Sequence, residues 1–278
     1  MNKEVFLKEK KNNQFSLNIK DGVNNGKLEF SLAKWETKTL KKKCGKITLF
    51  RSSSSLIAEQ LIKKFNQIIK KENFFWVQLD SINIYSRSKI INQVFFKNGF
   101  QISNKYLSWV LKKKQVNLKL IKLLSDKNLF RIAKKKDIKK LSNFTEKYPD
   151  PGRYVAKKNF RKYGIKLYKS WVTNSIKDNN KKVFFYEKNN KILAYQAISY
   201  NYKKKIMTLG ILRNSKEIPS LGTLILINSI KFFLKQKKLT MLNTRSSEFN
   251  IEINKINLSL GMKMKSKGIN FQRFYKII

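Results

Sequence analysis

The sequence predicts a mixed α/β (α+β) fold, in which a central, mostly antiparallel sheet is flanked by helices and preceded by a smaller αβ domain. Strand-like runs rich in β-branched and aromatic residues alternate with amphipathic helical segments. Of the 278 residues, 41% are hydrophobic and 13% aromatic, enough for one large core or two small ones. We place the boundary near Ser125, so that residues 1–125 form the first domain and 126–278 the second.

In the first domain, KITLF (46–50) and FFWVQLD (74–80) predict strands on either side of a helix, LIAEQLIKKFNQIIKK (56–71). A further helix through SKIINQVFFKN ends at Gly99, because glycine suits the residue that terminates a helix. FQISNKYLSWVLKK then predicts a strand, and KKKQVNLKLIKLLSDKN (112–128) follows without tight turn signals.

For the second domain, the sequence predicts these elements in order along the chain: a strand, helices, three antiparallel strands, a helix, a strand, a helix and a closing hairpin. RIAKKKDIKKLSNF (131–144) predicts a strand and a helix, and YPDPGRY (148–154) is a loop. A second helix has one apolar face, formed by Tyr168, Trp171, Val172 and Ile176. Two strands joined at 188–191 and a third over 206–213 come next. The rest is a helix with Leu226, Ile230, Phe233 and Leu234 buried, the strand KKLTMLNTRSS, the helix NIEINKINLSL, and GMKMKSKGINFQRFYKII as the hairpin.

The charge of the chain has two interpretations. Sixty-two Lys and Arg against 17 Asp and Glu give a net charge of +45, which is typical of nucleic-acid binders. Residues with A/T-rich codons, however, crowd the whole chain, and the lysines are spread throughout it. We favour codon bias, and we do not expect a nucleic-acid partner, although so positive a field attracts anions.

Missing residue types exclude several kinds of chemistry. The chain has no His and a single Cys, Cys44, so we expect no Ser-His-Asp or Cys-His catalysis, no metal and no disulfide within the chain. The longest apolar stretch, LGTLILINSI, is far shorter than the ~20 residues of a membrane span. The N-terminus lacks the apolar core of a secretory signal, so we expect a cytoplasmic protein.

One segment, NSKEIPSLGTLILIN (214–228), changes from a polar loop to an apolar helix. A helix N-terminus preceded by free backbone amides binds phosphate groups. The alternative is that Pro219 and Gly222 only shape a turn into a buried helix. The segment by itself leaves both interpretations open.

The order of elements around this loop resembles the GNAT superfamily of N-acetyltransferases, which transfer an acyl group from coenzyme A to an amine. The whole chain is most similar to the dTDP-fucosamine acetyltransferase branch, through LAKWETKTL (32–40), KNGFQISNKYLSWVL (97–111), GRYVAKKNF and LYKSWVTNSI. KNGFQISNKYLSWV and SLGMKMKSKGINFQRF also resemble each other. The resemblance implies that the first domain is itself like half of an acetyltransferase core.

The resemblance implies acetyl-CoA as co-substrate and a set of residues that bind it. The family's pyrophosphate loop, Gln/Arg-x-x-Gly-x-Gly/Ala, aligns with Glu217, Ser220 and Gly222, so Gly222 matches and the other two differ. The pyrophosphate would lie on Leu221, Gly222 and Thr223. Pantetheine would pair with the strand before the loop, and Asn250 matches a family Asn that contacts the cofactor. The strand residues concerned are Leu209, Gly210, Ile211 and Leu212.

The family's catalytic position departs from the pattern. The tyrosine that protonates the leaving thiolate lies four residues before a Gly-Phe pair, and here Asn257 stands four residues before Gly261-Met262. An amide can donate a hydrogen bond but cannot give up a proton. Tyr275 or water would then supply the proton, or the thiolate would leave unassisted, since a thiol pKa of about 8.5 makes it a fair leaving group.

We therefore expect an acetyl-CoA-dependent N-acetyltransferase that acts on a primary amine, an amino-sugar carried on a nucleotide. Arg153, beside two prolines in a loop, is a candidate for holding such an anionic acceptor, with a plain surface arginine as the alternative. The resemblance also implies a homodimer. Two other hypotheses stay open: a coenzyme A-binding module with weakened catalysis, and a basic nucleic-acid-binding protein.

Overall fold

The chain folds into two compact αβ units in a computed structural model. The structure describes residues 3–10, 14–81, 84–86, 91–123, 130–148, 160–215, 217–218 and 220–275. Unit 1 comprises residues 1–104 and 268–278, and unit 2 comprises residues 105–267. The predicted boundary at residue 125 therefore lies inside unit 2, and the end of the chain belongs to unit 1.

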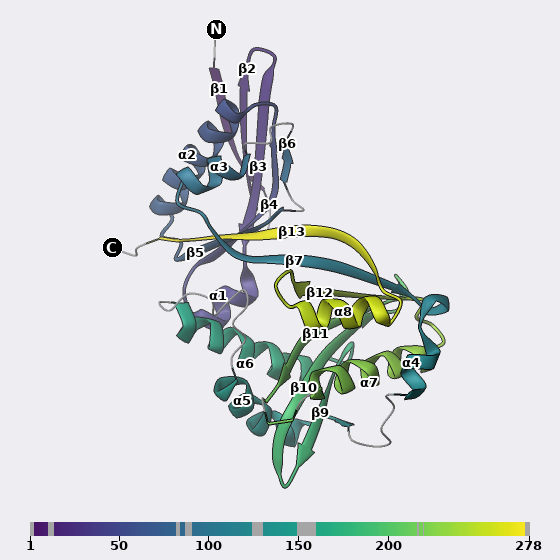
Figure 1. Cartoon of the computed structure of the whole chain (residues 1–278). Coiled ribbons are helices and arrows are strands. Elements are labelled where there is room, and N and C mark those ends of the chain that lie inside the picture. The colour runs from purple at the N-terminus through teal and green to yellow at the C-terminus, as the bar shows by residue number, and fades with distance from the viewer. Residues whose placement is uncertain are drawn as a thin grey trace. The chain divides into compact units, whose positions relative to one another are not determined.

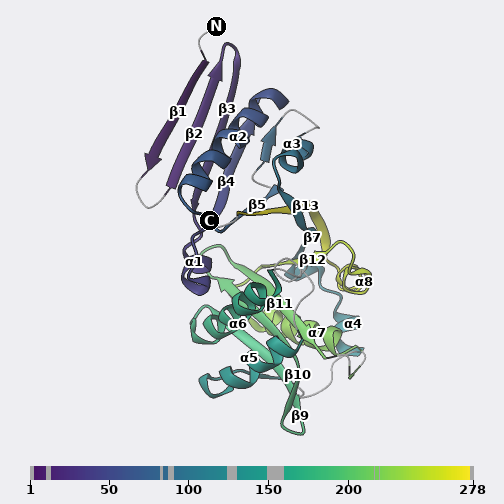
Figure 2. The ribbon, with the colours of Figure 1, turned by 90° about the vertical axis from the view of Figure 1, so that its left-hand side faces the viewer.

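Unit 1 is a sheet covered by two helices on one face (Figures 1 and 2). Its strands run in the order β1-β2-β3-β4-β5-β13-β7, and β6 pairs with β4. The elements are β1 (Lys3–Lys10), β2 (Gln14–Asp21), β3 (Asn24–Leu32), α1 (Lys34–Leu40), β4 (Cys44–Ser52), α2 (Ser55–Lys71), β5 (Trp76–Asp80), β6 (Ile84–Ser86), α3 (Ile91–Lys97), the start of β7 (Gln101–Lys112) and the end of β13 (Lys263–Phe274).

The core of unit 1 lies between the sheet and helices α2 and α3. Helix α2 begins at Ser54, whose side chain accepts a hydrogen bond from the backbone N–H of Ile57, and it buries an apolar face along its length. Its fully buried Phe65 packs edge-on against Phe30 of β3. These aromatic contacts continue through Phe95 to Phe271 of β13, so the last strand of the chain completes the core of the first unit.

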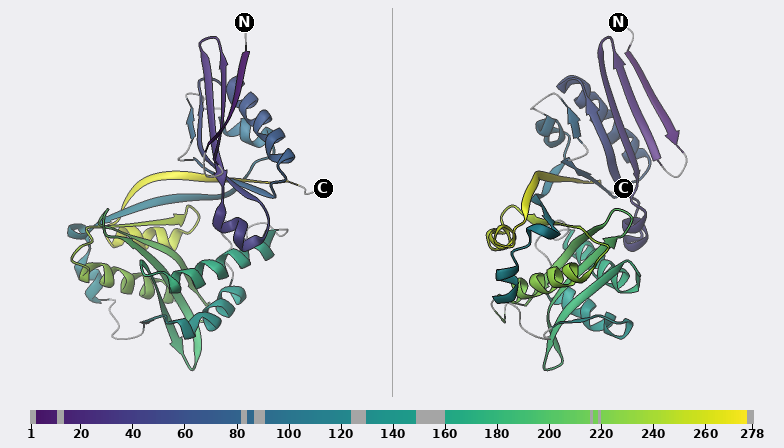
Figure 3. Two further views of the ribbon diagram at one scale, coloured as in Figure 1. Left: turned by 180° about the vertical axis from the view of Figure 1, so that it is seen from behind. Right: turned by 90° about the vertical axis from the view of Figure 1, so that its right-hand side faces the viewer.

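Unit 2 is a sheet with helices on both faces: Figure 3 shows α5 and α6 on one face and α7 on the other. Its strand order is β8-β9-β10-β11-β12-β7. The elements after β7 are the 3₁₀ turn η2 (Lys113–Gln115), α4 (Leu118–Leu123), β8 (Phe130–Ile132), the 3₁₀ turn η3 (Lys135–Asp137), α5 (Ile138–Lys147), α6 (Arg161–Lys177), β9 (Lys181–Lys188), β10 (Lys191–Asn201), β11 (Ile206–Asn214), α7 (Leu221–Lys235), β12 (Met241–Ser247), α8 (Ile251–Ser259) and the start of β13.

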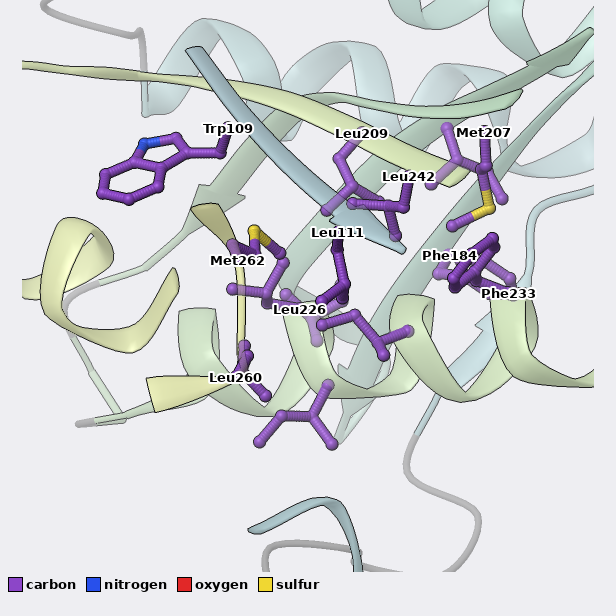
Figure 4. Packing of buried hydrophobic residues seen from close by; sticks show 14 of the residues in the cluster. Trp109, Leu111, Phe184, Met207, Leu209, Leu226, Phe233, Leu242, Leu260 and Met262 are labelled. Atoms are coloured by element: carbon purple, nitrogen blue, oxygen red, sulfur yellow. The ribbon is translucent and has the colours of Figure 1, made fainter. Parts of the chain in front are cut away.

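The core of unit 2 forms between α7 and the sheet (Figure 4). Of the predicted buried face of α7, Leu226, Ile230 and Phe233 are at most 3% exposed, whereas Leu234 is only partly buried. Strand β10 is buried on both faces because helices cover both sides of it. The helix and its supporting strands therefore form one rigid base for the loop that precedes α7.

Two strands contribute to both units. Strand β7 begins in unit 1 and continues into unit 2, where it pairs with β12 along Tyr106–Lys112. Strand β13 runs the opposite way and pairs in unit 1 with β5, from Asn270 to Phe274. The predicted closing hairpin is wrong: residues 263–274 form a single strand, because its partners come from distant parts of the chain and not from a turn within the segment.

The two units share one chain pattern, which confirms the predicted internal similarity. In each, a parallel strand pair is joined by a helix, a short helix follows, and a glycine leads into a long strand. Gly99 and Gly261 have φ of 80° and 90°, so both end their helices in the left-handed conformation. The amide after each glycine donates to a helical carbonyl, of Phe95 in unit 1 and of Asn257 in unit 2.

Most of the predicted elements of residues 131–262 are confirmed. The turn at 188–191 is the predicted hairpin, with Asn189 and Asn190 both at positive φ. The analysis of the sequence missed strands β1 to β3 and helix α4. In β2 and β3 the signal was present, because apolar residues alternate with polar ones in FSLNI (15–19) and LEFSL (28–32). Among the residues that the structure describes, no helix is long and apolar enough to cross a membrane.

An ion pair between the exposed Arg131 and the buried Asp137 fixes the start of α5 to the edge strand β8. Arg131 donates hydrogen bonds of 2.9 Å to both carboxylate oxygens of Asp137, and the backbone N–H of Lys134 donates another at 2.8 Å. Asp137 is 3% exposed. The hydrogen bond from Arg131 holds the pKa of Asp137 below its usual value, so the charged form stabilises the fold.

We expect Asp137→Asn to lower the free energy of unfolding at pH 7 by about 1–2 kcal/mol, because it removes the charge that Arg131 binds. The unfolded carboxyl titrates near pH 4 and the folded one lower, so the contribution of Asp137 is present above pH ~4 and lost as the pH falls through the folded pKa. Urea unfolding across pH 3–7 measures this. Glu146→Gln, in the exposed pair with Lys169, is the control and should change little. A pH-independent gap would contradict the assignment.

Candidate functional site

Strands β11 and β12 of unit 2 diverge and leave two unpaired edges facing each other. They pair in parallel only over residues 206–208 and 241–243. Beyond these, β11 continues to Asn214 and β12 to Ser247. The outer edges are occupied, since β11 pairs with β10 and β12 pairs with β7 along its whole length. The backbone amides and carbonyls of the inner edges are therefore available to an extended ligand.

The equivalent gap in unit 1 is filled. Strands β4 and β5 also pair in parallel, over residues 44–47 and 76–79. Where β4 goes on alone, at Phe50–Ser52, the short strand β6 (Ile84–Ser86) pairs with it. In the parts of the chain that the structure describes, the gap of unit 2 is thus open and its counterpart in unit 1 is closed by the protein itself.

The open strand β11 leads directly to the N-terminus of α7. Ser220 adopts the left-handed conformation, with φ of 64°, and its carbonyl accepts the first hydrogen bonds of the helix, from Thr223 and Leu224. The amides of Leu221 and Gly222 lie in the first turn, where a helix has no acceptor of its own for them and where its dipole is positive. These two amides and the helix dipole would suit an anion.

Two other residues of the loop differ in what they contribute. Glu217 is exposed and accepts a hydrogen bond of 3.1 Å from the hydroxyl of Tyr148, so it brings a negative charge to the loop. Gly222 is helical, and an added Cβ would meet Asn214 and Leu212 at 3.4 Å, an ordinary contact. Neither backbone conformation nor packing of the described residues requires glycine there.

The packing of the protein itself explains why position 210 is a glycine. A Cβ at this position would lie 3.1 Å from the carbonyl oxygen of Ala197 and 3.5 Å from Trp171. Strand β10 bulges opposite it, between Gln196 and Ile198, and Gln196 donates a hydrogen bond of 3.1 Å to the Gly210 carbonyl. The glycine therefore allows a close packing of β10, β11 and α6 whether or not a ligand binds.

Buried amides that the analysis of the sequence missed lie next to the gap. Asn243 occupies the last paired position of β12, and its side-chain oxygen is buried without a hydrogen-bond partner in the described residues. Gln196 is 1% exposed, and its side-chain oxygen is also buried without a hydrogen-bond partner in the described residues. In the sequence, each of these residues is a single amide inside a mostly apolar run, Gln196 in KILAYQAISY and Asn243 in TMLNT, and this was the signal that could have indicated them.

Helix α8 carries Asn257, the residue at the family's tyrosine position. Asn257 is 1% exposed, and neither atom of its amide group has a hydrogen-bond partner among the described residues. Asn254, one turn earlier, is fully engaged: it donates to the carbonyls of Ser247 and Glu248 and accepts from Ser246. Ser246 in turn accepts from the indole of Trp109, so the helix is held firmly on β12 and β7.

Unit 1 provides an internal comparison for Asn257. The carbonyl of Phe95 accepts the hydrogen bond of Phe100, as that of Asn257 accepts the bond of Met262. Phe95 is fully buried and packs against the rings of Phe50 and Phe271. The same backbone position therefore holds a packed aromatic ring in the closed unit and an unsatisfied amide in the open one, although such an amide costs about 1–3 kcal/mol.

Comparisons with known proteins agree on the fold. No protein-family model and no curated protein sequence matches the chain. A conserved protein of unknown function from Staphylococcus epidermidis has a TM-score of 0.63 at 11% identity, with 90% of this chain and 91% of that one covered. A GCN5-related N-acetyltransferase from Sphaerobacter thermophilus has 0.56 at 7%, covering 93% and 80%. A tandem GNAT protein from the clavulanic acid biosynthesis pathway has 0.53 at 9%, covering 94% and 82%.

The fold is that of the GNAT acetyltransferases. At these identities the likeness concerns the fold and not the activity. The tandem arrangement of the clavulanic acid pathway protein fits the two units of this chain. In unit 2, Leu209–Leu212 belong to β11, which ends at Asn214, and α7 begins at Leu221.

Three further predicted site residues have other surroundings. Asn250 caps α8, because its side-chain oxygen accepts from the amide of Ile253. Tyr275 lies in the core of unit 1, where its hydroxyl donates to Asn66 at 2.7 Å and burial raises its pKa, so its placement gives no support to a role in proton transfer. Arg153, with most of the loop at 148–154, lies outside the described residues.

We expect Asn257→Leu to raise the free energy of unfolding by about 1–2 kcal/mol, because it replaces a buried amide without partners by an apolar side chain of similar size. Thermal and urea unfolding of the ligand-free protein measure this change.

Asn254→Leu is the matched control in the same helix. It should lower stability by about 1–3 kcal/mol, because it leaves Ser246, Ser247 and Glu248 without their partners. Equal losses in both variants would mean that Asn257 is satisfied in solution.

Proposed function

We propose that the chain is an acetyl-CoA-dependent N-acetyltransferase whose donor cleft is the open gap between β11 and β12 in unit 2. The observation that carries the proposal is that this gap is open and leads to a helix N-terminus, while its counterpart in unit 1 is closed by β6. One donor site per chain follows.

Different segments of unit 2 bind different parts of acetyl-CoA. The exposed edge of Leu209–Leu212 pairs with the amides of the pantetheine arm as an added strand would. The amides of Leu221, Gly222 and Thr223 hold the pyrophosphate at the positive end of α7. The carboxylate of Glu217 is part of the same loop, so it repels the pyrophosphate.

In the transfer step, the amine nitrogen of the acceptor attacks the thioester carbonyl, the carbon–sulfur bond breaks, and the amine proton is lost to solvent or to a base. Backbone amides of an open strand stabilise the oxyanion that forms. Asn257 can donate a hydrogen bond to the leaving sulfur but cannot protonate it. The thiolate therefore leaves with help from water or from a hydrogen bond alone.

For the acceptor we propose a primary amine on an amino-sugar carried by a nucleotide. The support is the similarity of LAKWETKTL, GRYVAKKNF and LYKSWVTNSI to the dTDP-fucosamine acetyltransferase branch. Arg153 is the residue that we assign to the phosphates of the acceptor. A homodimer and a cytoplasmic location stay predictions from the same resemblance and from the sequence.

Asn257 favours a second candidate function, a module that binds coenzyme A without turnover. The family's tyrosine is replaced by a residue with no acidic proton, and Ser220 and Glu217 replace two conserved loop residues. A third candidate, nucleic-acid binding, has one specific observation: a groove in unit 2 lined by Phe130, Phe184, Phe232, Asn228, Ile132 and the cations Arg131, Lys134, Lys136, Lys231 and Lys235.

Calorimetry with coenzyme A tests the donor site. We expect one molecule to bind per chain, and pantetheine, which lacks the phosphates, to bind at least tenfold more weakly. Glu217→Gln should tighten coenzyme A binding about three- to tenfold, because it removes a negative charge beside the pyrophosphate. Glu252→Gln, in the first turn of α8, is the control and should leave the affinity unchanged.

Two results would contradict the proposal. Two molecules of coenzyme A per chain would reject the single donor site, because they would place a site in unit 1 as well. No binding of coenzyme A, together with RNA binding that weakens steeply with salt, would replace the acetyltransferase by the nucleic-acid binder.

Release of free thiol separates the enzyme from the non-catalytic module. With acetyl-CoA and a panel of amines that includes nucleotide-linked amino-sugars, we expect thiol release above background and a product acetylated on nitrogen. Thiol release that matches the background for every amine, in a protein that binds coenzyme A, would favour the module. N-acetylation of simple amines but not of amino-sugars would support the proposal of an N-acetyltransferase and reject the proposal that its acceptor is an amino-sugar.

A further inference from the structure

Helix α8 of unit 2 carries apolar residues on its exposed face. Ile251 and Leu258 are 64% and 59% exposed, and Figure 2 shows α8 on the outside of the unit. They are seven positions apart, which is about two helical turns, so they lie on the same side of the helix. A surface helix normally turns its apolar residues to the core and its polar residues to water. Helix α8 departs from this pattern, because Asn257 is buried while Ile251 and Leu258 are exposed.

Three further exposed apolar side chains adjoin α8. Phe249, in the turn that leads into the helix, is 73% exposed, and Met264, at the start of β13, is 49% exposed. Leu118 is 55% exposed and follows Asn117, whose side-chain amide donates a hydrogen bond of 3.1 Å to the carbonyl of Ser259 at the end of α8. The surface that these residues form along α8, here called the apolar patch, comprises Leu118, Phe249, Ile251, Leu258 and Met264.

The turn that presents Phe249 is held in place by hydrogen bonds. Asn254 donates through its side-chain amide to the carbonyls of Ser247 and Glu248, each at 3.1 Å. The backbone N–H of Asn250 donates to the carbonyl of Ser247, also at 3.1 Å. The ring of Phe249 is therefore directed to solvent by a fixed backbone. Exposed apolar side chains that gather on one ordered surface mark a contact with another molecule.

The charges around the apolar patch narrow the class of partner. The charged side chains of residues 118–119 and 248–267 are the acids Glu248 and Glu252 and the cations Lys119, Lys255, Lys263, Lys265 and Lys267. A second copy of the chain, with its net charge of +45, would bring further cations against them, so like charges oppose self-association at this face. The same positive field attracts an anionic surface, and the apolar patch determines which face of unit 2 contacts it.

The form of the apolar patch favours a lipid surface. Its side chains project from a turn, from two helices and from the start of a strand, and a bilayer accepts such side chains without a matching shape. Helices that lie in the headgroup region combine Phe, Leu and Ile side chains with lysines in the same way. The lysine stems can extend along the apolar side chains while their ammonium groups stay beside anionic headgroups.

We propose that the apolar patch docks unit 2 on the surface of a membrane that contains anionic lipid. Phe249, Ile251 and Leu258 enter the boundary between headgroups and acyl chains, and Lys255, between the last two on the helix, stays at the headgroups. The contact is peripheral, because no helix in the described parts of the chain is long and apolar enough to cross a membrane. The proposal does not depend on acetyl transfer.

Cosedimentation of the full chain with lipid vesicles tests the docking. We expect the chain to bind vesicles of phosphatidylcholine and phosphatidylserine, and to bind vesicles of phosphatidylcholine alone about tenfold more weakly. Phe249→Ser combined with Leu258→Ser should weaken binding to the anionic vesicles by about tenfold or more, because two apolar side chains no longer leave water. Val23→Ser is the matched control: Val23 is 95% exposed outside the apolar patch, so its loss should not change binding.

Fluorescence quenching separates insertion of the apolar patch from adsorption through lysines alone. In anionic vesicles that contain brominated phosphatidylcholine, we expect Phe249→Trp to add quenched emission to that of the unmodified chain, and Val23→Trp to add none. Equal quenching of the two variants, or serine variants that bind vesicles as the unmodified chain does, would overturn the proposal. A dimer in sedimentation velocity that dissociates in Leu258→Ser would also overturn it, because the face would then bind a second copy. None of these results bears on coenzyme A binding.

Discussion

The short parallel pairing of β11 and β12 is the constraint on which the functional interpretation depends. Each strand is bound along its outer edge to an antiparallel neighbour, β10 or β7, and each follows the twist of that neighbour. The inner edges therefore separate after residues 208 and 243. Because α7 starts where β11 ends, the separation places unpaired amides of a strand and of a helix N-terminus in one continuous region. An extended ligand with an anionic end fits both.

The two units have the same order of elements but differ at the gap between their parallel strands. Both have a parallel pair joined by a helix, and both end a short helix with a left-handed glycine. In unit 1, β6 fills the gap between the strands and Phe95 fills the core behind it. In unit 2 the gap is open, and the position of Phe95 is held by the unsatisfied Asn257. At this pair of equivalent positions, the side chain is packed in the unit whose gap is closed and unsatisfied in the unit whose gap is open.

Some of the unsatisfied buried amides lie at the candidate site of unit 2, whereas the net charge of the chain does not indicate a site. The excess of lysine is spread over the surface and follows no single feature of the fold. Asn243, Gln196 and Asn257 in unit 2, and Asn270 and Gln272 in unit 1, are few and carry an energetic cost. Such residues persist against selection for stability when a ligand or a reaction uses them.

The sequence by itself determined most elements of residues 131–262 and the place of the loop before α7. Periodic apolar residues in α7 and the Asn189-Asn190 turn depend on local chemistry, and local chemistry is readable along the chain. Gly222 and Asn257 were assigned to the site only through the resemblance to the family's motifs, and their roles there stay predictions. Tertiary structure alone decided the rest. Residues 263–274 form one strand and not a hairpin because β5 is their partner, and no local pattern reports a partner so far away in sequence. The burial of Asn257, Asn270 and Gln272 likewise depends on packing between distant segments, so only the folded chain reveals which of its many amides lack a hydrogen bond.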